Sequence, residues 1–230
     1  VLGERTKLVY KNLMDEKKLF VVPGSVEDTA PLNVGNAIFK DEKDIVNVLY
    51  FSFMTESKGV LTAFKSVPSV LNKNPQVRFA FAGPIQSESI QQAFNQLCNQ
   101  YNSRVEYLGY VDKISRRTEI YRNADIFIFP THRDVFGLVL LHAMAEGLPV
   151  IASIEGNIPE IIRDGVNGFL IPKGDDVQLA ERILRLVADE QLREKMGEFN
   201  RQRYVQLYSP QRYGQRMIDT FVEINKLDMC

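Results

Sequence analysis

One stretch of the sequence gathers residue types that can bind an anion. Asp134 precedes Phe136, Gly137 and Leu138, where a helix is expected to begin shortly after a buried strand. Amides at a helix start lack intrahelical partners and carry the positive end of the helix dipole, so they bind anions. Gly137 has no side chain, so a ligand can approach its backbone closely. The segment therefore predicts an anion site in which backbone amides are the donors.

A lysine earlier in the chain could provide the matching cation. Lys58 lies before Gly59 at an expected helix start, where a positive side chain is disfavoured by about 0.3–1 kcal/mol. We interpret this placement as a sign that Lys58 faces a phosphate, and neutralisation by Glu56 is the alternative. Asp134 also has a purely structural alternative, because Asp is a favoured N-cap residue.

The spacing of further side chains extends the expected site. Asp134, Leu138 and His142 are four residues apart, so they would share one face over about 12 Å if all three were helical. A ligand that joins a sugar, a diphosphate and a ribose has this length. Glu155 and Gly156 follow the next expected strand and should reach the same edge. His142 as an ordinary half-buried helix residue and Glu155 as a solvated loop acid remain alternatives.

The sequence predicts a scaffold of alternating strands and helices that would position these residues. Apolar strands are expected at 18–26, 45–54, 77–84, 105–111, 125–130, 149–153 and 168–172. Helices are expected at 1–14, 58–71, 87–101, 114–124, 136–147 and from 176 to the end, with a break near 209–210. Continuously apolar strands are buried on both faces, which favours a parallel sheet covered by helices on each side. The expected fold is α/β, a doubly wound Rossmann-like sheet with ligands at the carboxyl ends of its strands.

Composition excludes several other classes of protein. The 230 residues include 28 Lys and Arg against 29 Asp and Glu, so no cationic field is available for a dedicated nucleic-acid binder. Cys98 and Cys230 cannot build a disulfide framework, and we expect a reducing, cytoplasmic setting. His132 and His142 are not at zinc-site spacing. The glycine-rich signatures of dinucleotide and P-loop sites are absent, and we expect no metal and no cofactor.

Several motifs, taken in their order, resemble the C-terminal donor-binding domain of family-4 retaining glycosyltransferases, which have the GT-B fold. These motifs are SKG at 57–59, VEYLGYV, IYRNAD, FGLVLLHAMAEGLPVIAS, GNIPEII and DGVNGFLIP. The resemblance covers the chain from about residue 18. It implies a role in polysaccharide or related glycan synthesis, with a UDP-, GDP- or ADP-linked sugar as the donor. The sugar would pass with retention to a hydroxyl group of a glycan or lipid-linked acceptor.

The resemblance also implies where each part of the donor lies. The base would lie against the segments that follow Gly83 and Gly109, which include Tyr110 and Val111. The diphosphate would contact the Lys58 ammonium and the backbone amides of Phe136, Gly137 and Leu138. Glu155 and Gly156 would complete the donor-binding set. Lys58 and Asp134 are the candidate catalytic residues.

Three positions depart from the pattern of the family. Two glutamates flank this helix start in the family and contact the sugar and the ribose, whereas Asp134 and His142 stand here. Phe53 stands where the family commonly has an arginine for the diphosphate. These changes keep open a catalytically degenerate binding or regulatory module of the same fold. A sugar-nucleotide epimerase and a purely structural interaction domain are weaker alternatives.

The resemblance finally implies that an N-terminal acceptor domain is missing. We expect a junction helix and first strand at 1–26, the donor domain at 27–208 and a crossing helix at 209–230. An apolar stripe on that last helix should be exposed, dimerised or repacked, and consists of Tyr213, Met217, Phe221 and Ile224. We expect low activity from this chain alone, and a peripheral association with a membrane only through the missing domain.

Overall fold

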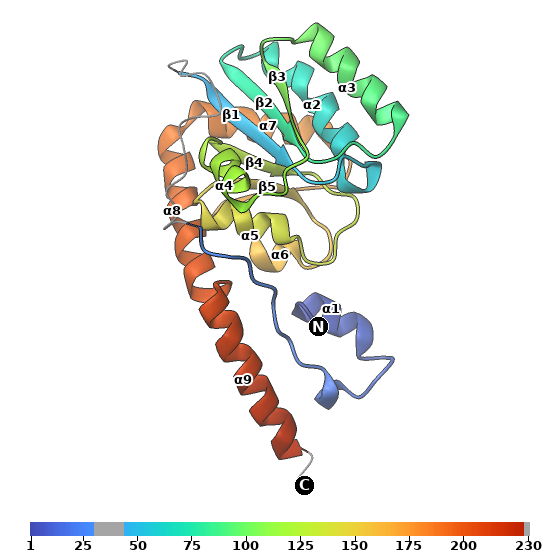
Figure 1. Cartoon of the computed structure of the whole chain (residues 1–230), viewed down its shortest axis with the longest axis vertical. Coiled ribbons are helices and arrows are strands. Elements are labelled where there is room, and N and C mark those ends of the chain that lie inside the picture. Colours follow the sequence, from blue (N-terminus) through green and yellow to red (C-terminus); the bar gives the residue numbers. More distant parts are fainter. Residues whose placement is uncertain (30–43, 228–230) are drawn as a thin grey trace.

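The computed structural model describes residues 1–29 and 44–227, which are built around a parallel sheet (Figure 1). Its six strands follow the order β3-β2-β1-β4-β5-β6, and every neighbouring pair is parallel. The strands are β1 (Val46–Phe51), β2 (Val77–Ala82), β3 (Val105–Gly109), β4 (Ile126–Phe129), β5 (Val150–Ser153) and β6 (Gly168–Ile171). The predicted doubly wound Rossmann-like fold is confirmed, because this strand order is typical of it.

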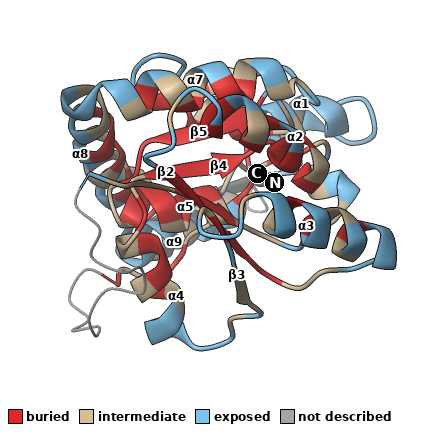
Figure 2. Cartoon of the chain, turned by 90° about the horizontal axis from the view of Figure 1, so that it is seen from above, coloured by how far each residue is buried: buried red, intermediate tan, exposed pale blue. Residues whose placement is uncertain are grey.

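Helices cover both faces of the sheet because alternate strand residues point to opposite sides. Val48 and Tyr50 belong to one core cluster, which includes residues of α2 (Val60–Leu71), α3 (Glu88–Gln100) and α7 (Asp176–Ala188). Leu49 belongs to the second cluster, and the helices on that side are α4 (Ile114–Arg122), α5 (Leu138–Ala145), α6 (Ile158–Ile161) and α8 (Glu190–Leu207). Figure 2 shows the buried strands between these two layers. Strands β2, β4 and β5 are buried along their whole length, whereas Glu106 and Tyr107 of the edge strand β3 are exposed.

The predicted strand at 18–26 is wrong. A short 3₁₀ turn covers Glu16–Lys18, and the residues after it run extended without joining the sheet. The amide of Val22 donates to the carbonyl of Val1 at 2.9 Å instead of to a strand. Leu19 is buried and Val26 packs in the second core cluster, so the apolar run reflects tertiary packing rather than strand pairing. Residues 30–43, which follow this segment, lie outside the described residues.

Local side-chain and backbone chemistry explains several helix ends. The hydroxyl of Ser87 accepts a hydrogen bond from the amide of Ile90 at 3.3 Å, so Ser87 is the N-cap of α3. Gly147 follows α5 with a φ of 72°, the left-handed conformation that favours glycine after a helix. The expected helix from 176 is divided at Asp189, whose carboxylate accepts from the amide of Leu192 and so begins α8.

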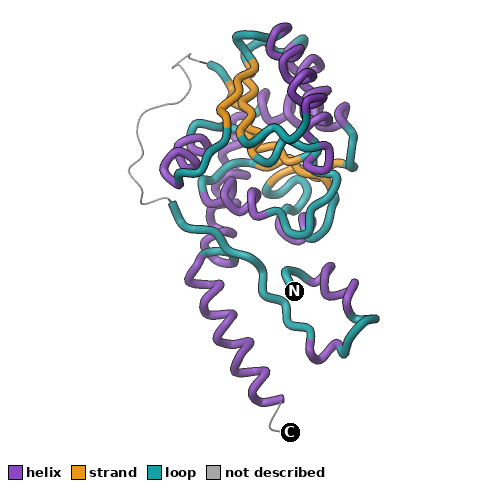
Figure 3. Tube along the Cα trace, turned by 45° about the vertical axis from the view of Figure 1, so that its right-hand side comes forward, coloured by secondary structure: helices purple, strands orange, loops and turns teal. Residues whose placement is uncertain are grey.

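The first and last helices extend from the same side of the domain (Figures 1 and 3). They are α1 (Glu4–Tyr10) and α9 (Pro210–Leu227). On α9, Tyr213 and Phe221 are exposed, whereas Met217 and Ile224 are half-buried. The stripe on α9 is therefore largely exposed rather than repacked on the domain. Within residues 1–29 and 44–227, no helix has both the length and the apolar character required to cross a bilayer.

Gly59 brings the start of α2 against the end of β4. Its φ of 71° is left-handed, and a Cβ added to it would lie 1.7 Å from the carbonyl oxygen of Pro130. No side chain fits at that distance. The loop after β1 and the loop after β4 can touch only because residue 59 is glycine.

We predict that Gly59→Ala destabilises the protein by about 1–3 kcal/mol more than Gly165→Ala. Gly165 is the matched control, because its φ is 72° but an added Cβ would meet no atom within 4 Å. Both variants carry the left-handed strain of about 1–2 kcal/mol, and only Gly59→Ala adds a clash with backbone. Urea denaturation of the two variants measures the difference. Equal free energies of unfolding would contradict the close approach.

Candidate functional site

The loops that follow β1 and β4 are joined by an ion pair. The Lys58 Nζ lies 2.6 Å from Asp134 Oδ2, and the two side chains are 27% and 12% exposed. The buried Tyr50 hydroxyl donates to the Lys58 carbonyl at 3.1 Å, which fixes the backbone of Lys58. The partner of Lys58 is thus Asp134 rather than Glu56. Two residues that the sequence assigned to one site are in direct contact.

The second carboxylate oxygen of Asp134 accepts a hydrogen bond from the amide of Phe136 at 2.9 Å. Helix α5 begins only at Leu138, and Gly137 takes the N-cap position with a φ of 79°. Asp134 therefore lies before the helix, so the condition for a shared helical face with Leu138 and His142 is not met. The alternative that Asp134 is the N-cap of this helix is also wrong. Its carboxylate accepts from the Phe136 amide, which lies before the helix.

Helix α5 begins four residues after Asp134, and no side chain caps its first turn within the described residues. Gly137 cannot accept a hydrogen bond through a side chain. Its carbonyl accepts from the Leu140 amide at 2.9 Å, so in the described part of the chain the amides of Gly137 and Leu138 are left for another acceptor. The Phe136 side chain is buried and Leu138 is exposed. This segment combines backbone donors, a left-handed glycine and a nearby ammonium group, which are the elements of an anion site.

The loop after β5 packs against the backbone of Asp134. Gly156 has a φ of 48°, and an added Cβ would lie 2.2 Å from the carbonyl oxygen of Asp134. The neighbouring Glu155 forms an ion pair of 3.0 Å with Lys173, which follows β6. The sequence analysis missed Lys173, although its position after the last expected strand was a usable signal. Glu155 is therefore a paired acid rather than a freely solvated one.

The site lies where the strand order reverses. The chain runs outward from β1 to β3 in one direction and from β4 to β6 in the other, so the crevice opens between β1 and β4. Open α/β sheets bind ligands at this switch point, beyond the carboxyl ends of the strands. Lys58 and Asp134 follow these two central strands. Their contact is a consequence of the topology.

The residues expected near a base lie farther along the same edge. The amide of Gly83 donates to the carbonyl of Gly109 at 2.8 Å, which joins the ends of β2 and β3. The Tyr107 hydroxyl adds a second link, donating to the Gly83 carbonyl at 2.9 Å. Tyr110 follows β3 and is 70% exposed, and Val111 is half-buried beside it. This end of the edge presents an exposed aromatic ring.

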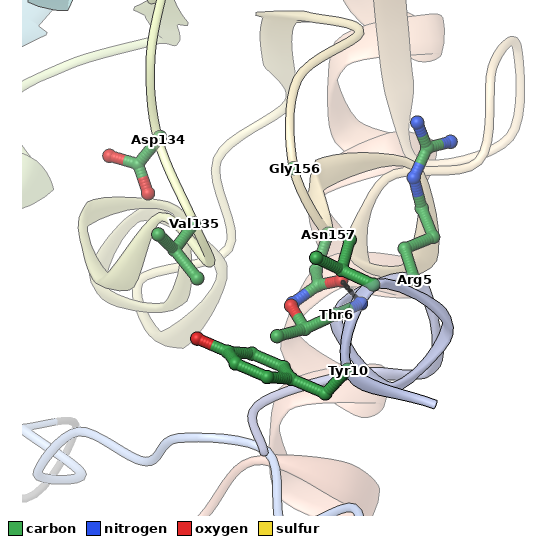
Figure 4. A pocket seen from close by; sticks show the side chains of 8 residues that line it. Arg5, Thr6, Tyr10, Asp134, Val135, Gly156 and Asn157 are labelled. Carbon is green, nitrogen blue, oxygen red and sulfur yellow. Dashed lines mark hydrogen bonds between the residues drawn. The ribbon is translucent and has the colours of Figure 1, made fainter. Parts of the chain in front are cut away.

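A cleft of about 370 Å³ opens beside Asp134 (Figure 4). One side of it comes from the loops after β4 and β5, namely Asp134, Val135, Gly156 and Asn157. The other side comes from α1, namely Arg5, Thr6, Val9 and Tyr10. The sequence analysis did not predict this contribution of α1, since a short amphipathic helix carries no signal for it.

His142 lies in a different environment from Asp134. Its ring packs on Tyr121 with centroids 5.9 Å apart, and it lines a small polar pocket with residues that include Arg117 and Glu146. Burial, with a smaller contribution from the positive Arg117, lowers the pKa of His142 to about 4. The imidazole is therefore neutral near pH 7. Its expected contact with a ribose stays a prediction.

The sequence of this chain is similar to those of known proteins. Residues 45–189 match the family model described as "Glycosyl transferases group 1". The chain is 32% identical over 164 residues to the capsular polysaccharide biosynthesis glycosyltransferase CapM of Staphylococcus aureus, covering 70% of this chain and 42% of that protein. It is 29% identical over 187 residues to N-acetyl-alpha-D-glucosaminyl L-malate synthase of Bacillus anthracis, covering 81% of this chain and 46% of that protein.

A solved structure extends the likeness to nearly the whole chain. The crystal structure of Anabaena Alr3699/HepE in complex with UDP superposes with a TM-score of 0.81 at 19% identity, covering 96% of this chain and 62% of that one. This chain spans less than half the length of the two relatives above. It belongs to the group 1 glycosyltransferases, and its Rossmann-like domain is of the kind found in GT-B enzymes.

We predict that acid destabilises the protein partly through His142. Its pKa is about 4 in the folded chain and about 6.5 in an unfolded one. Between these values the unfolded chain binds a proton that the folded chain does not, so stability falls as the pH drops from about 6.5 toward 4. His142→Gln cannot bind that proton. Its loss of stability between pH 7 and pH 5 should be about 1–2 kcal/mol smaller than that of the wild type.

Urea denaturation at the two pH values measures this difference. Comparing each protein with itself cancels any fixed cost of the substitution. Identical losses for the wild type and His142→Gln would show that the imidazole is not held neutral.

Proposed function

We propose that this chain is the donor-binding part of a glycosyltransferase and binds a nucleotide-sugar at the carboxyl edge of its sheet. The observation that carries the proposal is the placement of Lys58 beside the uncapped start of α5, at the switch point between β1 and β4. Membership of the group 1 glycosyltransferases supports it, and so does the UDP bound by the related fold of HepE.

The diphosphate would bind between the Lys58 ammonium and the amides of Gly137 and Leu138. The Phe136 amide, which the sequence also assigned to the diphosphate, already donates to Asp134 at 2.9 Å. A lysine ammonium has three N–H donors, and Asp134 accepts from one of them at 2.6 Å. The ion pair thus directs the ammonium without using all its donors. The partial positive charge at the start of α5 adds to the attraction. The sugar would extend toward Asp134 and the base toward Tyr110.

In the proposed reaction the donor transfers its sugar to a hydroxyl group of an acceptor. The acceptor oxygen bonds to the anomeric carbon while the bond from that carbon to the diphosphate oxygen breaks. The bonding electrons remain on the diphosphate, which also takes the proton of the acceptor hydroxyl. Lys58 and the α5 amides would stabilise this charge as it develops, through preorganised electrostatics. We propose that the configuration at the anomeric carbon is retained. We assign no metal to the step, because Lys58 and the α5 amides supply the positive charge.

The acceptor would be held by a second domain outside this chain. The exposed sides of α1 and α9 extend beyond the donor domain, and the matched relatives are more than twice as long as the aligned segment. We therefore propose that the chain binds donor by itself and transfers sugar slowly or not at all.

A second candidate function is a catalytically degenerate module that keeps the fold. Phe53 is 55% exposed after β1, where the family resemblance implies an arginine for the diphosphate. His142 lines a pocket apart from the cleft beside Asp134. A wild-type chain that binds no UDP, GDP or ADP at millimolar concentration would favour this reading over the donor-binding one.

We predict that Lys58→Ala weakens binding of the preferred nucleoside diphosphate by about 10- to 100-fold, the range of one charge-assisted hydrogen bond. The loss arises from the missing ammonium and from Asp134, which would then face the diphosphate without a counter-charge. Isothermal titration calorimetry with UDP, GDP and ADP measures the affinities.

Lys65→Ala is the matched control, because Lys65 is an exposed lysine on α2. It removes the same charge without touching the site, so its affinity should equal that of the wild type. If Lys58→Ala and Lys65→Ala bound the nucleotide equally well, the assignment of the diphosphate to Lys58 would be wrong.

A further inference from the structure

We propose that Tyr10, on α1, forms the outer wall of a sugar-binding subsite whose inner wall is Asp134. This inference rests on the proposed function and adds a specificity-determining residue from outside the sheet domain. The ligand class is a pyranose ring, carried either by the donor or by a sugar acceptor. The inference starts from the cleft of about 370 Å³ between α1 and the loops after β4 and β5.

Helix α1 is fixed against the domain by directed hydrogen bonds. The amides of Glu4 and Arg5 donate to the two carboxylate oxygens of Glu160 at 3.0 and 2.7 Å. The amide of Thr6 donates to the side-chain oxygen of Asn157 at 3.1 Å, and the amide nitrogen of Asn157 donates back to the Thr6 hydroxyl at 2.6 Å. A carboxylate that accepts from the first-turn amides also complements the helix dipole.

This anchor gives α1 a defined place relative to the site. Asn157 is fully buried, and it directly follows Gly156 in the loop that packs on the Asp134 backbone. An added Cβ on Gly3 would lie 2.6 Å from the Asn157 side chain, so the chain before α1 also passes closely. Residues far apart in the sequence thereby become opposite walls of one cleft.

Tyr10 is the α1 residue best placed to contact a ligand in this cleft. Figure 4 shows its ring extending from α1 toward Val135, whereas the Arg5 side chain points away from it. Thr6 is already bonded to Asn157. The Tyr10 side chain is 42% exposed. Within the described part of the chain, no hydrogen bond to its hydroxyl is formed.

The chemistry of the two walls fits a sugar. A pyranose ring has hydroxyl groups around its rim and C–H bonds on its faces. The Asp134 oxygens already accept from Lys58 and from the Phe136 amide, and each keeps a lone pair that can accept from a sugar hydroxyl. The Tyr10 ring offers a rigid apolar face with a polar tip. The volume of the cleft is at the lower end of the range for small-molecule sites, about 300–1,000 Å³. A whole nucleotide-sugar would not fit, but one sugar ring with its rim exposed would.

The test compares the nucleotide with its sugar conjugate. Calorimetry on the 230-residue chain first identifies which of UDP, GDP and ADP binds. The glucose, galactose and N-acetylglucosamine conjugates of that nucleotide are then titrated, together with methyl α-glucopyranoside added to the nucleotide-saturated chain. The variants are Tyr10→Ala, Tyr10→Phe and, as the matched control, Leu8→Ala. Leu8 is an exposed residue of the same helix that does not line the cleft.

We expect Tyr10→Ala to weaken binding of the preferred sugar conjugate by about three- to tenfold, the size of one ring contact. The affinity for the free nucleotide should be unchanged. Tyr10→Phe should keep the affinity if the ring makes the contact and lose it if the hydroxyl does. Leu8→Ala should match the wild type. A loss confined to methyl α-glucopyranoside would identify the acceptor sugar, rather than the donor sugar, as the occupant.

Two results would overturn the inference in distinguishable ways. One result is that the nucleotide binds and Tyr10→Ala changes the affinity of neither the sugar conjugates nor the glucoside. Tyr10 is then not a wall of the subsite, while the proposed function stands. If no nucleotide binds the wild type, the proposed function fails and the subsite fails with it. A thermal melt of each variant confirms that α1 substitutions leave the domain folded, as the exposure of both side chains implies.

Discussion

At the centre of the carboxyl edge, the Lys58 ammonium lies 2.6 Å from the Asp134 carboxylate and joins the loops that follow β1 and β4. The pair is mostly shielded from solvent, so each charge depends on the other more than an exposed surface pair would. Asp134 uses its second oxygen to hold the Phe136 amide. One carboxylate therefore sets both the direction of the ammonium and the entry of the chain into α5.

This arrangement depends on backbone contacts that only glycine permits. Gly59 lets the start of α2 meet Pro130, and Gly156 lets the loop after β5 meet Asp134. In each case an added Cβ would overlap a carbonyl oxygen. Three loops from neighbouring strands can then converge on one point, and the cleft beside Asp134 follows from that convergence. The buried parallel sheet supplies the rigid base, because its strands are covered on both faces.

The sequence predicted the sheet well and the contacts between loops less well. Strands such as β2 and β4 are buried on both faces, so their apolar runs carry a direct signal. The run at 18–26 is also rich in apolar residues but does not join the sheet. Composition cannot distinguish this tertiary outcome from a strand. Local rules placed a helix start at Phe136, whereas the left-handed Gly137 delays it to Leu138. The Lys58–Asp134 contact and the position of Tyr10 beside the cleft each bring distant segments together, so no local pattern could reveal them.

The most direct test of a donor site at this edge is to observe the backbone amides themselves. Two-dimensional ¹H–¹⁵N NMR spectra of the isotope-labelled chain, titrated with UDP, GDP and ADP, report each amide separately. We expect the nucleotide that binds to shift the Gly137 and Leu138 resonances most strongly, with smaller shifts at Gly59 and Gly156. Shifts confined to the opposite edge of the sheet, or a spectrum unchanged at millimolar nucleotide, would contradict it.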